Sequence, residues 1–394
     1  MDFDHKKLER LIPPSVHPVL DELHQYGFIV TLVGGSVRDY FMNGSLGKDW
    51  DVELSHETIA FNQTDWKDLG KKLTKFGKVT FLPYDVIRLD LEKIQMEFSP
   101  PRIEVYRSND NGHSNFDAEF NFKLPFPEAI QRRDFTINAM GLRFRAGHKV
   151  EHLDPSQGLS HIGQKVLCPV GNDFSKDPVR FLRAIRFSEK YKFKLSPELA
   201  EIMKGMSVER ISPVYFWSEM QKSENPLGFL EKILQEKNHH PELVLPLDIT
   251  SQDVTKLKKV LTHPKSHDSW IMALEWVGID SERWRKYFSL GSDSSRKLAR
   301  WAQNSKLFQN VLPENLQGEF DEILKKENFD KLFDWYFSTK QLLQKNPELP
   351  LLKMIEEYLP EWIHLYKFEA PKDVKHIDPP LRAKYQVWNL CQRI

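Results

Sequence analysis

The segment that begins at Phe28 constrains the fold more than any other part of the chain. Phe28 to Val33 (FIVTLV) is a short apolar run rich in β-branched residues, which favours a strand. Gly34-Gly35 ends this run, and Val37 to Phe41 has the pattern of a helix start. Trp50 to Leu54 then alternates apolar and polar residues as a second strand does. A strand, a glycine turn, a helix and a strand in this order predict an α/β domain.

Strand patterns continue for about 150 residues and then almost disappear. Lys78 to Phe81 and Met96 to Phe98 indicate strands, whereas the polar, turn-rich segment from Ser108 to Phe122 predicts a loop. After about residue 175, helical spacing dominates; it covers Lys176 to Lys190, Ser196 to Met206, Pro213 to Lys222 and Pro226 to Glu236.

The remaining sequence is also helical in pattern. Asn238 to Thr250 reads as a connector, and Ser251 to Ile394 predicts further helices rich in Trp and Leu. The fold class is therefore an α/β head with a mixed sheet, followed by an all-helical neck, body and tail. We expect domain boundaries at 1–150, 151–237 and 238–394.

Composition restricts the compartment and the class of partner. The chain has only two cysteines, Cys168 and Cys391, without metal spacing or a disulfide framework, which favours a reducing cytoplasm. The N-terminus lacks the apolar core of a signal peptide, and no run of about 18 apolar residues predicts a membrane span. No feature indicates a stable protein partner.

The chain carries equal numbers of basic and acidic residues, 56 of each. This balance is unusual for a protein that binds nucleic acid, because phosphates require a basic surface. The segment from Gln131 to Phe193 is richer in Arg and Lys than in acids, so it predicts a local basic face.

The glycine turn carries a phosphate-binding pattern. Gly34 and Gly35 allow the backbone to turn tightly and present N–H groups to an anion at the start of the following helix. Arg38, one turn later, is placed to clamp phosphate oxygens. The same pattern alone also fits an ordinary turn.

Asp49 and Asp51 flank Trp50 in the second predicted strand. Residues two apart on a strand point to the same side, and two close carboxylates repel each other unless they share a cation. Carboxylates, phosphates and water are the ligands that Mg²⁺ prefers. The pair beside a phosphate-binding turn therefore predicts a Mg²⁺-dependent nucleotidyl-transfer centre.

Such a centre usually includes a third carboxylate on a neighbouring strand. We predict Glu97 for this position. Glu53 and Glu104 are the alternatives; Glu53 would share the face of the two aspartates but lies further along the strand.

Two later motifs combine arginines with acids or amides. In the segment Arg132 to Met140 (RRDFTINAM), Arg133 suits a phosphate, and Asp134 or Asn138 suits ribose hydroxyls. The alternative is that Asp134 only caps a helix.

Asp177 and Arg180 fall on one face of a helix start, with Pro178 as its first residue. The carboxylate accepts and the guanidinium donates hydrogen bonds, so together they match the base edges of C and A but not of U or G. Helix capping alone would also explain Asp177.

These motifs, in this order, resemble the bacterial class II tRNA nucleotidyltransferases, the CCA-adding enzymes of the DNA polymerase β superfamily. The resemblance runs from about Thr31 to Ile233 through LVGGSVRD, DWD, QRRDFTINAM, DPSQGLSHI, KDPVRFLRAIRF and VERISPVYFWSEM. It implies a nucleotidyltransferase head, a neck that selects the base, and a body and tail that bind tRNA. It also implies addition of C, C and A to tRNA ends from CTP and ATP.

The same resemblance implies the site residues. Asp49 and Asp51 would hold Mg²⁺, with Glu97 as third carboxylate, since the segment from Met96 to Arg102 is similar to a family strand ending in arginine. Residues that would bind the nucleotide are Gly34, Gly35, Arg38, Arg102, Arg133, Asp134, Asn138, Asp177, Arg180, Arg183 and Arg186.

The chain departs from the family pattern at Lys176, where the family usually has Glu, which puts base preference and rate in question. Family members often carry a metal phosphohydrolase domain, but His267-Asp268 lacks partner ligands, so we interpret it as a helix start. Other functions remain open: a poly(A) polymerase, a CC-only or A-only enzyme, or a catalytically silent RNA-binding protein. The segment Leu82 to Arg88 carries one arginine rather than a basic patch, which favours CCA addition over the polymerase.

Overall fold

The computed structural model describes residues 8–106, 116–209, 211–261 and 266–290. The chain forms two compact units, one of residues 1–223 with 236–243 and the other of residues 224–235 with 244–394. The finer division at residues 150 and 237 stays a prediction.

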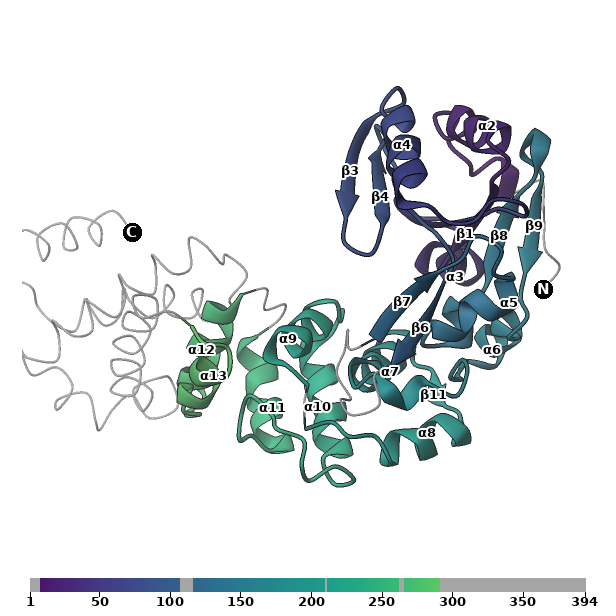
Figure 1. Cartoon of the computed structure of the whole chain (residues 1–394). Coiled ribbons are helices and arrows are strands. Elements are labelled where there is room, and N and C mark those ends of the chain that lie inside the picture. The colour runs from purple at the N-terminus through teal and green to yellow at the C-terminus, as the bar shows by residue number, and fades with distance from the viewer. Residues whose placement is uncertain (1–7, 107–115, 210, 262–265, 291–394) are drawn as a thin grey trace, which may run out of the picture. The chain divides into compact units, whose positions relative to one another are not determined.

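The first unit contains a seven-stranded sheet with the strand order β3-β4-β5-β2-β1-β8-β9 (Figure 1). Its strands are β1 (Ile29–Val33), β2 (Asp49–Ser55), β3 (Lys78–Leu82), β4 (Val86–Asp90), β5 (Gln95–Ser99), β8 (Gly141–Phe144) and β9 (Val150–Leu153). Among the described residues, β2 and β5 run parallel while the other neighbours in this sheet are antiparallel. The sheet confirms the predicted mixed α/β head.

One loop prediction is wrong in part. Residues Phe116–Phe120 form strand β7, which pairs with β6 (Arg102–Tyr106) in a separate two-stranded hairpin. Phe116, Ala118 and Phe120 are partly buried and alternate with the exposed Asp117 and Glu119, so the strand pattern was present but lay at the end of a polar, turn-rich segment. The predicted loop residues 108–115 lie outside the described part of the chain.

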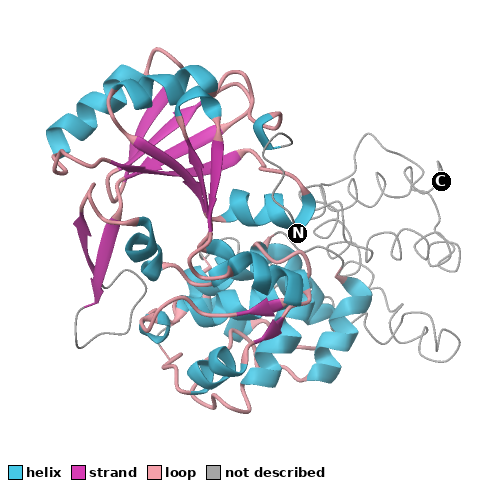
Figure 2. Cartoon of the chain, turned by 90° about the vertical axis from the view of Figure 1, so that its right-hand side faces the viewer, coloured by secondary structure: helices cyan, strands magenta, loops and turns pink. Residues whose placement is uncertain are grey.

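Helices lie over both faces of the sheet (Figure 2). Helices α2 (His17–Gln25) and α4 (Gln63–Leu73) cover one face, and α3 (Gly35–Asn43), α5 (Phe126–Ala129) and α6 (Gly158–Gln164) lie on the other side (Figure 1). Along β2, Trp50, Val52 and Leu54 are buried. Because side chains alternate along a strand, Asp49 and Asp51 point to the opposite face.

The rest of the first unit is mostly helical. It contains the helices α7 (Val179–Tyr191), α8 (Pro197–Lys204) and α9 (Pro213–Gln221), the two-residue strands β10 (Val166–Leu167) and β11 (Lys194–Leu195), and the short 3₁₀ helices η1 (Ile130–Arg132), η2 (Thr136–Asn138), η3 (Ala146–His148) and η4 (Phe174–Lys176). A buried ion pair of 2.6 Å between Arg186 and Glu219 joins α7 to α9.

The described part of the second unit is helical throughout. Its helices are α10 (Pro226–Glu236), whose last residue belongs to the first unit, α11 (Ser251–Val260), α12 (His267–Trp276) and α13 (Glu282–Tyr287). Trp270 stacks on Trp284, with ring centroids 5.2 Å apart, and both are fully buried. Helix α12 begins at His267, as predicted.

The helical character of the sequence after the head is thus confirmed for the described residues, whereas the helices predicted over 291–394 lie outside them. No described helix is both long enough and apolar enough to cross a membrane.

Candidate active site

The sheet register places the three predicted carboxylates together. Asp51 on β2 is the direct partner of Glu97 on β5, and Asp49 lies two residues before Asp51 on the same face. Burial raises the pKa of Asp51 most; the Arg133 guanidinium opposes this, and the charges of Glu97 and Asp49 raise the pKa further. These pKa contributions show that the carboxylates share one electrostatic environment.

The glycine turn lies directly beside this group. Gly34 has a φ of 79°, and a Cβ at this position would lie 3.0 Å from Asp51 Oδ2 and 3.1 Å from Arg133 Nη1. The Ser36 hydroxyl donates a hydrogen bond to the carbonyl of Asp49, which fixes the start of α3 against β2. The absence of a side chain at Gly34 thus lets the turn, the carboxylates and Arg133 meet.

The donor set fits a hard divalent cation. Among the described residues, no three His, Cys, Asp or Glu side chains form a ready-made metal cluster. The pair Asp49 and Asp51 offers only oxygen ligands, and like charges crowd Asp51. Mg²⁺ needs few protein carboxylates because substrate phosphates and water complete its shell.

Glu97 is held by donors from two strands. Its Oε1 accepts hydrogen bonds from Nε and Nη2 of Arg88, at 3.0 and 2.7 Å, and from Nε2 of Gln95 at 3.3 Å. All three donors converge on one oxygen. The carboxylate is therefore oriented while its other oxygen makes none of these bonds.

The two alternative carboxylates are placed differently. Glu53 is only 4% exposed, and burial raises its pKa, against the opposing charges of Arg132 and Arg133. Glu104 lies on the β6–β7 hairpin and pairs with Arg102 of its own strand at 2.7 Å. Of the three candidates, Glu97 is the one that pairs directly with Asp51 between β2 and β5.

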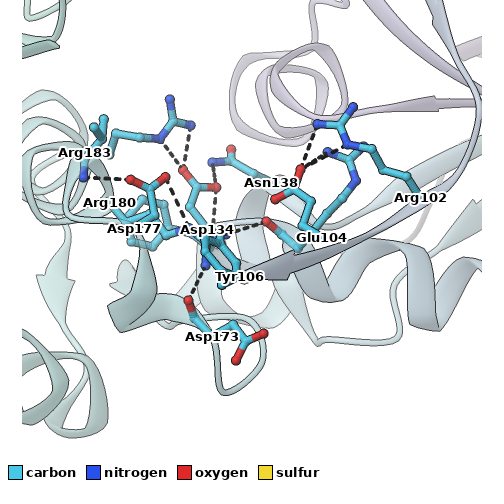
Figure 3. A network of polar contacts seen from close by, with 12 residues as sticks. Arg102, Glu104, Tyr106, Asp134, Asn138, Asp173, Asp177, Arg180 and Arg183 are labelled. Atoms are coloured by element: carbon cyan, nitrogen blue, oxygen red, sulfur yellow. Dashed lines mark hydrogen bonds and ion pairs between the residues drawn. The ribbon is translucent and has the colours of Figure 1, made fainter. Parts of the chain in front are cut away.

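A continuous polar network joins four of the predicted nucleotide-binding residues. Arg38 Nη1 donates to Asn138 Oδ1 at 2.7 Å, and Asn138 Nδ2 donates to Asp134 Oδ1 at 2.9 Å. Arg183 completes the chain with an ion pair of 2.6 Å to Asp134 Oδ2 (Figure 3). Burial alone would raise the pKa of Asp134, but Arg183 and the hydrogen bonds lower it to about 2, so the carboxylate is ionised.

Helix α7 spans Val179–Tyr191, and the predicted cap at its start is confirmed. Asp177, in an extended conformation, accepts a hydrogen bond from the Val179 N–H at 2.9 Å, and Pro178 follows Asp177 with helical dihedral angles (φ −63°, ψ −20°). The side chain of Asp177 thus satisfies a free N–H at the start of the helix. Arg180 Nε lies 3.9 Å from Asp177 Oδ2, which confirms that the two share a face.

Lys176, which replaces the usual family Glu, is turned to a neighbouring acid. Its Nζ pairs with Asp173 at 2.7 Å and lies 5.7 Å from the centre of the Tyr106 ring. Asp173 in turn accepts a hydrogen bond from Arg180 through its backbone carbonyl, at 3.1 Å.

Two predicted residues lie outside these groups. Arg186 is occupied by its buried pair with Glu219. Arg102 lies over the rings of Tyr84 and Phe116 and lines a cavity of about 270 Å³, which Arg132, Tyr106 and Asp173 also line. The predicted basic face is thus partly turned inward, because Arg180, Arg183 and Arg186 of α7 bond to acids and carbonyls.

The sequence did not point to three residues of the site: Ser36, Arg88 and Tyr106. A strand prediction over 102–106 would have placed Arg102, Glu104 and Tyr106 on one face. Likewise, a strand over 86–90 paired with the Glu97 strand would have shown Arg88 opposite Glu97. Ser36 belongs to the glycine-turn motif, whose serine had no assigned contact.

Comparison with known proteins agrees with this geometry. Residues 30–168 match the family model of the Poly A polymerase head domain. The match covers β1, the glycine turn, the carboxylates and the Arg38–Asn138–Asp134 part of the network, and it ends before α7.

Curated relatives of the chain include CCA proteins. The chain is 30% identical over 208 residues to the CCA-adding enzyme of Lactobacillus johnsonii. This alignment covers 49% of this chain and 47% of the relative. It is also 30% identical over 215 residues to the multifunctional CCA protein of Xanthomonas campestris pv. campestris, covering 52% of this chain and 48% of the relative. The chain thus matches about half the length of these curated relatives.

Solved structures share the fold over nearly the whole chain. An apo form of a CCA-adding enzyme has a TM-score of 0.66 at 18% identity and covers 98% of this chain and 93% of that one. The Thermotoga maritima CCA-adding enzyme complexed with tRNA has a TM-score of 0.61 at 17% identity, with 98% and 90% covered. At these identities, the likeness establishes the fold: an α/β head followed by helices.

Proposed function

We propose that this chain is a CCA-adding tRNA nucleotidyltransferase. It would add C, C and A to the 3′ end of tRNA from CTP and ATP, without a nucleic-acid template. The observation that supports this most directly is the register of β2 and β5, which sets Asp51 beside Glu97 next to Gly34 and Arg133. This arrangement combines a site for a divalent cation with a phosphate-binding turn.

In this proposal Asp49 and Asp51 hold Mg²⁺, with Glu97 as third carboxylate. The cation, when bound, supplies activation of the attacking hydroxyl and neutralises charge on the leaving pyrophosphate. The N–H groups of the turn at Gly34-Gly35 and the guanidinium of Arg133 bind the triphosphate, because they line the space beside Asp51.

The polar network positions the sugar and the base. Asn138 and Asp134, fixed between Arg38 and Arg183, present oxygen and nitrogen atoms to ribose hydroxyls. Asp177 accepts from the exocyclic amine of C or A while Arg180 donates to a ring acceptor. Arg102 would contact the nucleotide from the cavity that it lines. Arg186 would contribute indirectly, because its ion pair with Glu219 holds α7 against α9.

The helical remainder, residues 238–394, would bind the tRNA by shape and phosphate contacts. The Thermotoga maritima structure with tRNA supports this, since it shares the fold over 98% of this chain. Such an enzyme would work in the cytoplasm, where it meets tRNA, CTP and ATP. No stable protein partner is required.

A primer-extension experiment tests the proposal. The protein is incubated with Mg²⁺ and a tRNA that ends before its CCA, with CTP, ATP or both, and the new 3′ ends are sequenced. Ordered addition of C, C and A supports the proposal. A long A tail would indicate a poly(A) polymerase. Addition of C alone or of A alone would indicate a partial enzyme. No extension would contradict nucleotidyl transfer altogether.

Asp49→Ala is expected to reduce transfer by about a thousandfold, because loss of a metal ligand removes several kcal/mol of charge stabilisation. Binding of tRNA should be unchanged in a filter-binding assay, since the carboxylate does not meet the tRNA phosphates. Asp68→Ala, which removes an exposed carboxylate on α4 paired with Lys71, is the control. If Asp49→Ala extends tRNA at the control rate, the metal assignment is wrong.

A further inference from the structure

Arg180 is held by a hydroxyl group that the sequence motifs did not include. Its Nη2 donates to Tyr106 Oη at 3.2 Å and to the Arg132 carbonyl at 2.7 Å, and its Nη1 donates to the Asp173 carbonyl at 3.1 Å. Among the described residues, Tyr106 is therefore the one side chain that hydrogen-bonds this guanidinium. We propose that Tyr106 is a positioning residue for base selection, acting through Arg180. The inference rests on the proposed role of Arg180 in reading the base.

Arg180 is buried, so its guanidinium depends on these protein acceptors for its hydrogen bonds. Arg180 is only 4% exposed, and its guanidinium lies 5.8 Å from the centre of the Phe174 ring. The two carbonyl partners belong to the backbone; the Asp173 carbonyl accepts from Nη1 and the Arg132 carbonyl from Nη2. The Tyr106 hydroxyl is the second acceptor at Nη2, so without it one N–H of this buried guanidinium loses its partner.

Tyr106 itself is fixed by its neighbours. It is paired with Phe116 across the β6–β7 hairpin, with ring centroids 5.8 Å apart, and Lys176 lies over its ring at 5.7 Å. Burial raises its pKa to about 12, so the phenol is neutral at physiological pH. A neutral hydroxyl orients Arg180 without adding a second negative charge beside Asp177.

Base selection is sensitive to this orientation because a guanidinium reads a ring acceptor only when its donors are aligned. An Nη2 hydrogen freed from Tyr106 can donate to the acceptors of U or G as well as to those of C or A. We expect Tyr106→Phe to lower the preference for CTP and ATP over UTP and GTP by about tenfold, the scale of one hydrogen bond to a charged group.

Tyr84→Phe is the matched control. The Tyr84 ring stacks on the same Phe116 at 5.8 Å, but no described residue forms a hydrogen bond with its hydroxyl. Both variants therefore remove one phenolic oxygen from the same aromatic group, and only one removes a bond to Arg180.

The experiment measures kcat/KM for single additions of all four nucleotides to tRNA lacking CCA, and the binding of each triphosphate with Mg²⁺ by calorimetry. Tyr106→Phe should lose selection in both measurements, Tyr84→Phe in neither, and the Mg²⁺ dependence should stay unchanged. If Tyr106→Phe selects as well as the wild type, the inference is wrong while the proposed function stands. A wild-type chain that binds the four triphosphates equally contradicts both.

A double variant shows whether Tyr106 acts through Arg180. In an Arg180→Gln background, Tyr106→Phe should cause no further loss of selection, because the hydroxyl has no guanidinium to orient. Additive losses would mean that Tyr106 acts on the base by another route and would overturn its assignment as a positioning residue.

Discussion

At the scale of single residues, the side chain of Arg88 has two opposite effects on the site. It holds one oxygen of Glu97 through two hydrogen bonds, and its positive charge reduces the negative potential that a cation at Asp49 and Asp51 would meet. Arg88 and Glu97 are both partly exposed, at 34% and 28% of their side chains, so solvent screens the pair and its contribution to stability is small.

Changes at Arg88 and Glu97 should therefore move the Mg²⁺ requirement in opposite directions. Arg88→Met removes a positive charge and should lower the Mg²⁺ concentration for half-maximal transfer about threefold, even if the maximal rate falls. Glu97→Gln removes a negative charge and should raise that concentration. Titration of transfer rate and of Mn²⁺ binding by electron paramagnetic resonance measures both effects. A shift in the same direction for the two variants would exclude an electrostatic role for this pair.

At the scale of elements, the parts that the sequence predicts best are those with a local signal. The strand at β1, the glycine turn, α3 and β2 all follow from residues next to one another, and the structure confirms each of them. Strands β4, β8 and β9 and the β6–β7 hairpin went unpredicted, although β4, β9 and the hairpin strands pair with strands next to them in sequence. In β6 and β7 the alternating pattern covers only five residues in each strand, beside the polar, turn-rich segment that suggested a loop.

The turn between β1 and α3 allows a test with a matched pair of glycines. Gly34 and Gly47 both have positive φ, 79° and 67°, but a Cβ at Gly47 would meet nothing within 4 Å. Each change to Ala should cost about 1–2 kcal/mol of stability from backbone strain, measured by urea unfolding. Only Gly34→Ala should also abolish transfer, because its methyl group pushes against Asp51 and Arg133. If the two variants have equal transfer activity, the turn at Gly34 does not contribute to the active site.

The start of α12 carries a pH-dependent element in the second unit. His267 packs against Phe288, with ring centroids 4.5 Å apart, and burial lowers its pKa to about 4. The unfolded chain binds a proton near pH 6.5, so the folded state should lose stability as the pH falls from 6.5 towards 4. His267→Gln should flatten this dependence.

The measurement for His267 is the urea midpoint at pH 7.5 and 5 for the wild type, His267→Gln and His239→Gln. His239 is exposed, so its removal should leave the wild-type dependence in place. An unchanged difference between the two pH values in His267→Gln would show that other groups cause the acid sensitivity.

At the scale of the whole molecule, the sequence predicts candidate site residues but not the contacts between them. Arg38 and Asn138 are 100 residues apart, and only the fold shows that they share a hydrogen bond. Arg186 matches a family motif, but its pair with Glu219 depends on the packing of α7 against α9, which no local pattern contains. Motifs report which residues are present, whereas tertiary packing decides which charge neutralises which.

The neutral charge of the chain leads to a prediction for tRNA binding. With 56 basic and 56 acidic residues, the molecule has no net charge to attract tRNA from a distance. We expect binding to involve about three to five phosphates, so that log K falls against log salt with a slope of about −2 to −5 in filter-binding measurements. A slope near −10 would indicate an extensive basic face that the charge balance conceals.

The parallel pairing of β2 with β5 has a consequence for how the sequence of this protein can evolve. Parallel strands cannot be joined by a tight hairpin, so between Ser55 and Gln95 the chain passes through α4, β3 and β4 before it enters β5. The distance between Asp51 and Glu97 is set by the hydrogen bonds of this pair and not by the length of the intervening segment. Insertions at the exposed residues before α4 can therefore accumulate without moving the carboxylates apart, which gives this segment freedom to diversify while the catalytic spacing is preserved.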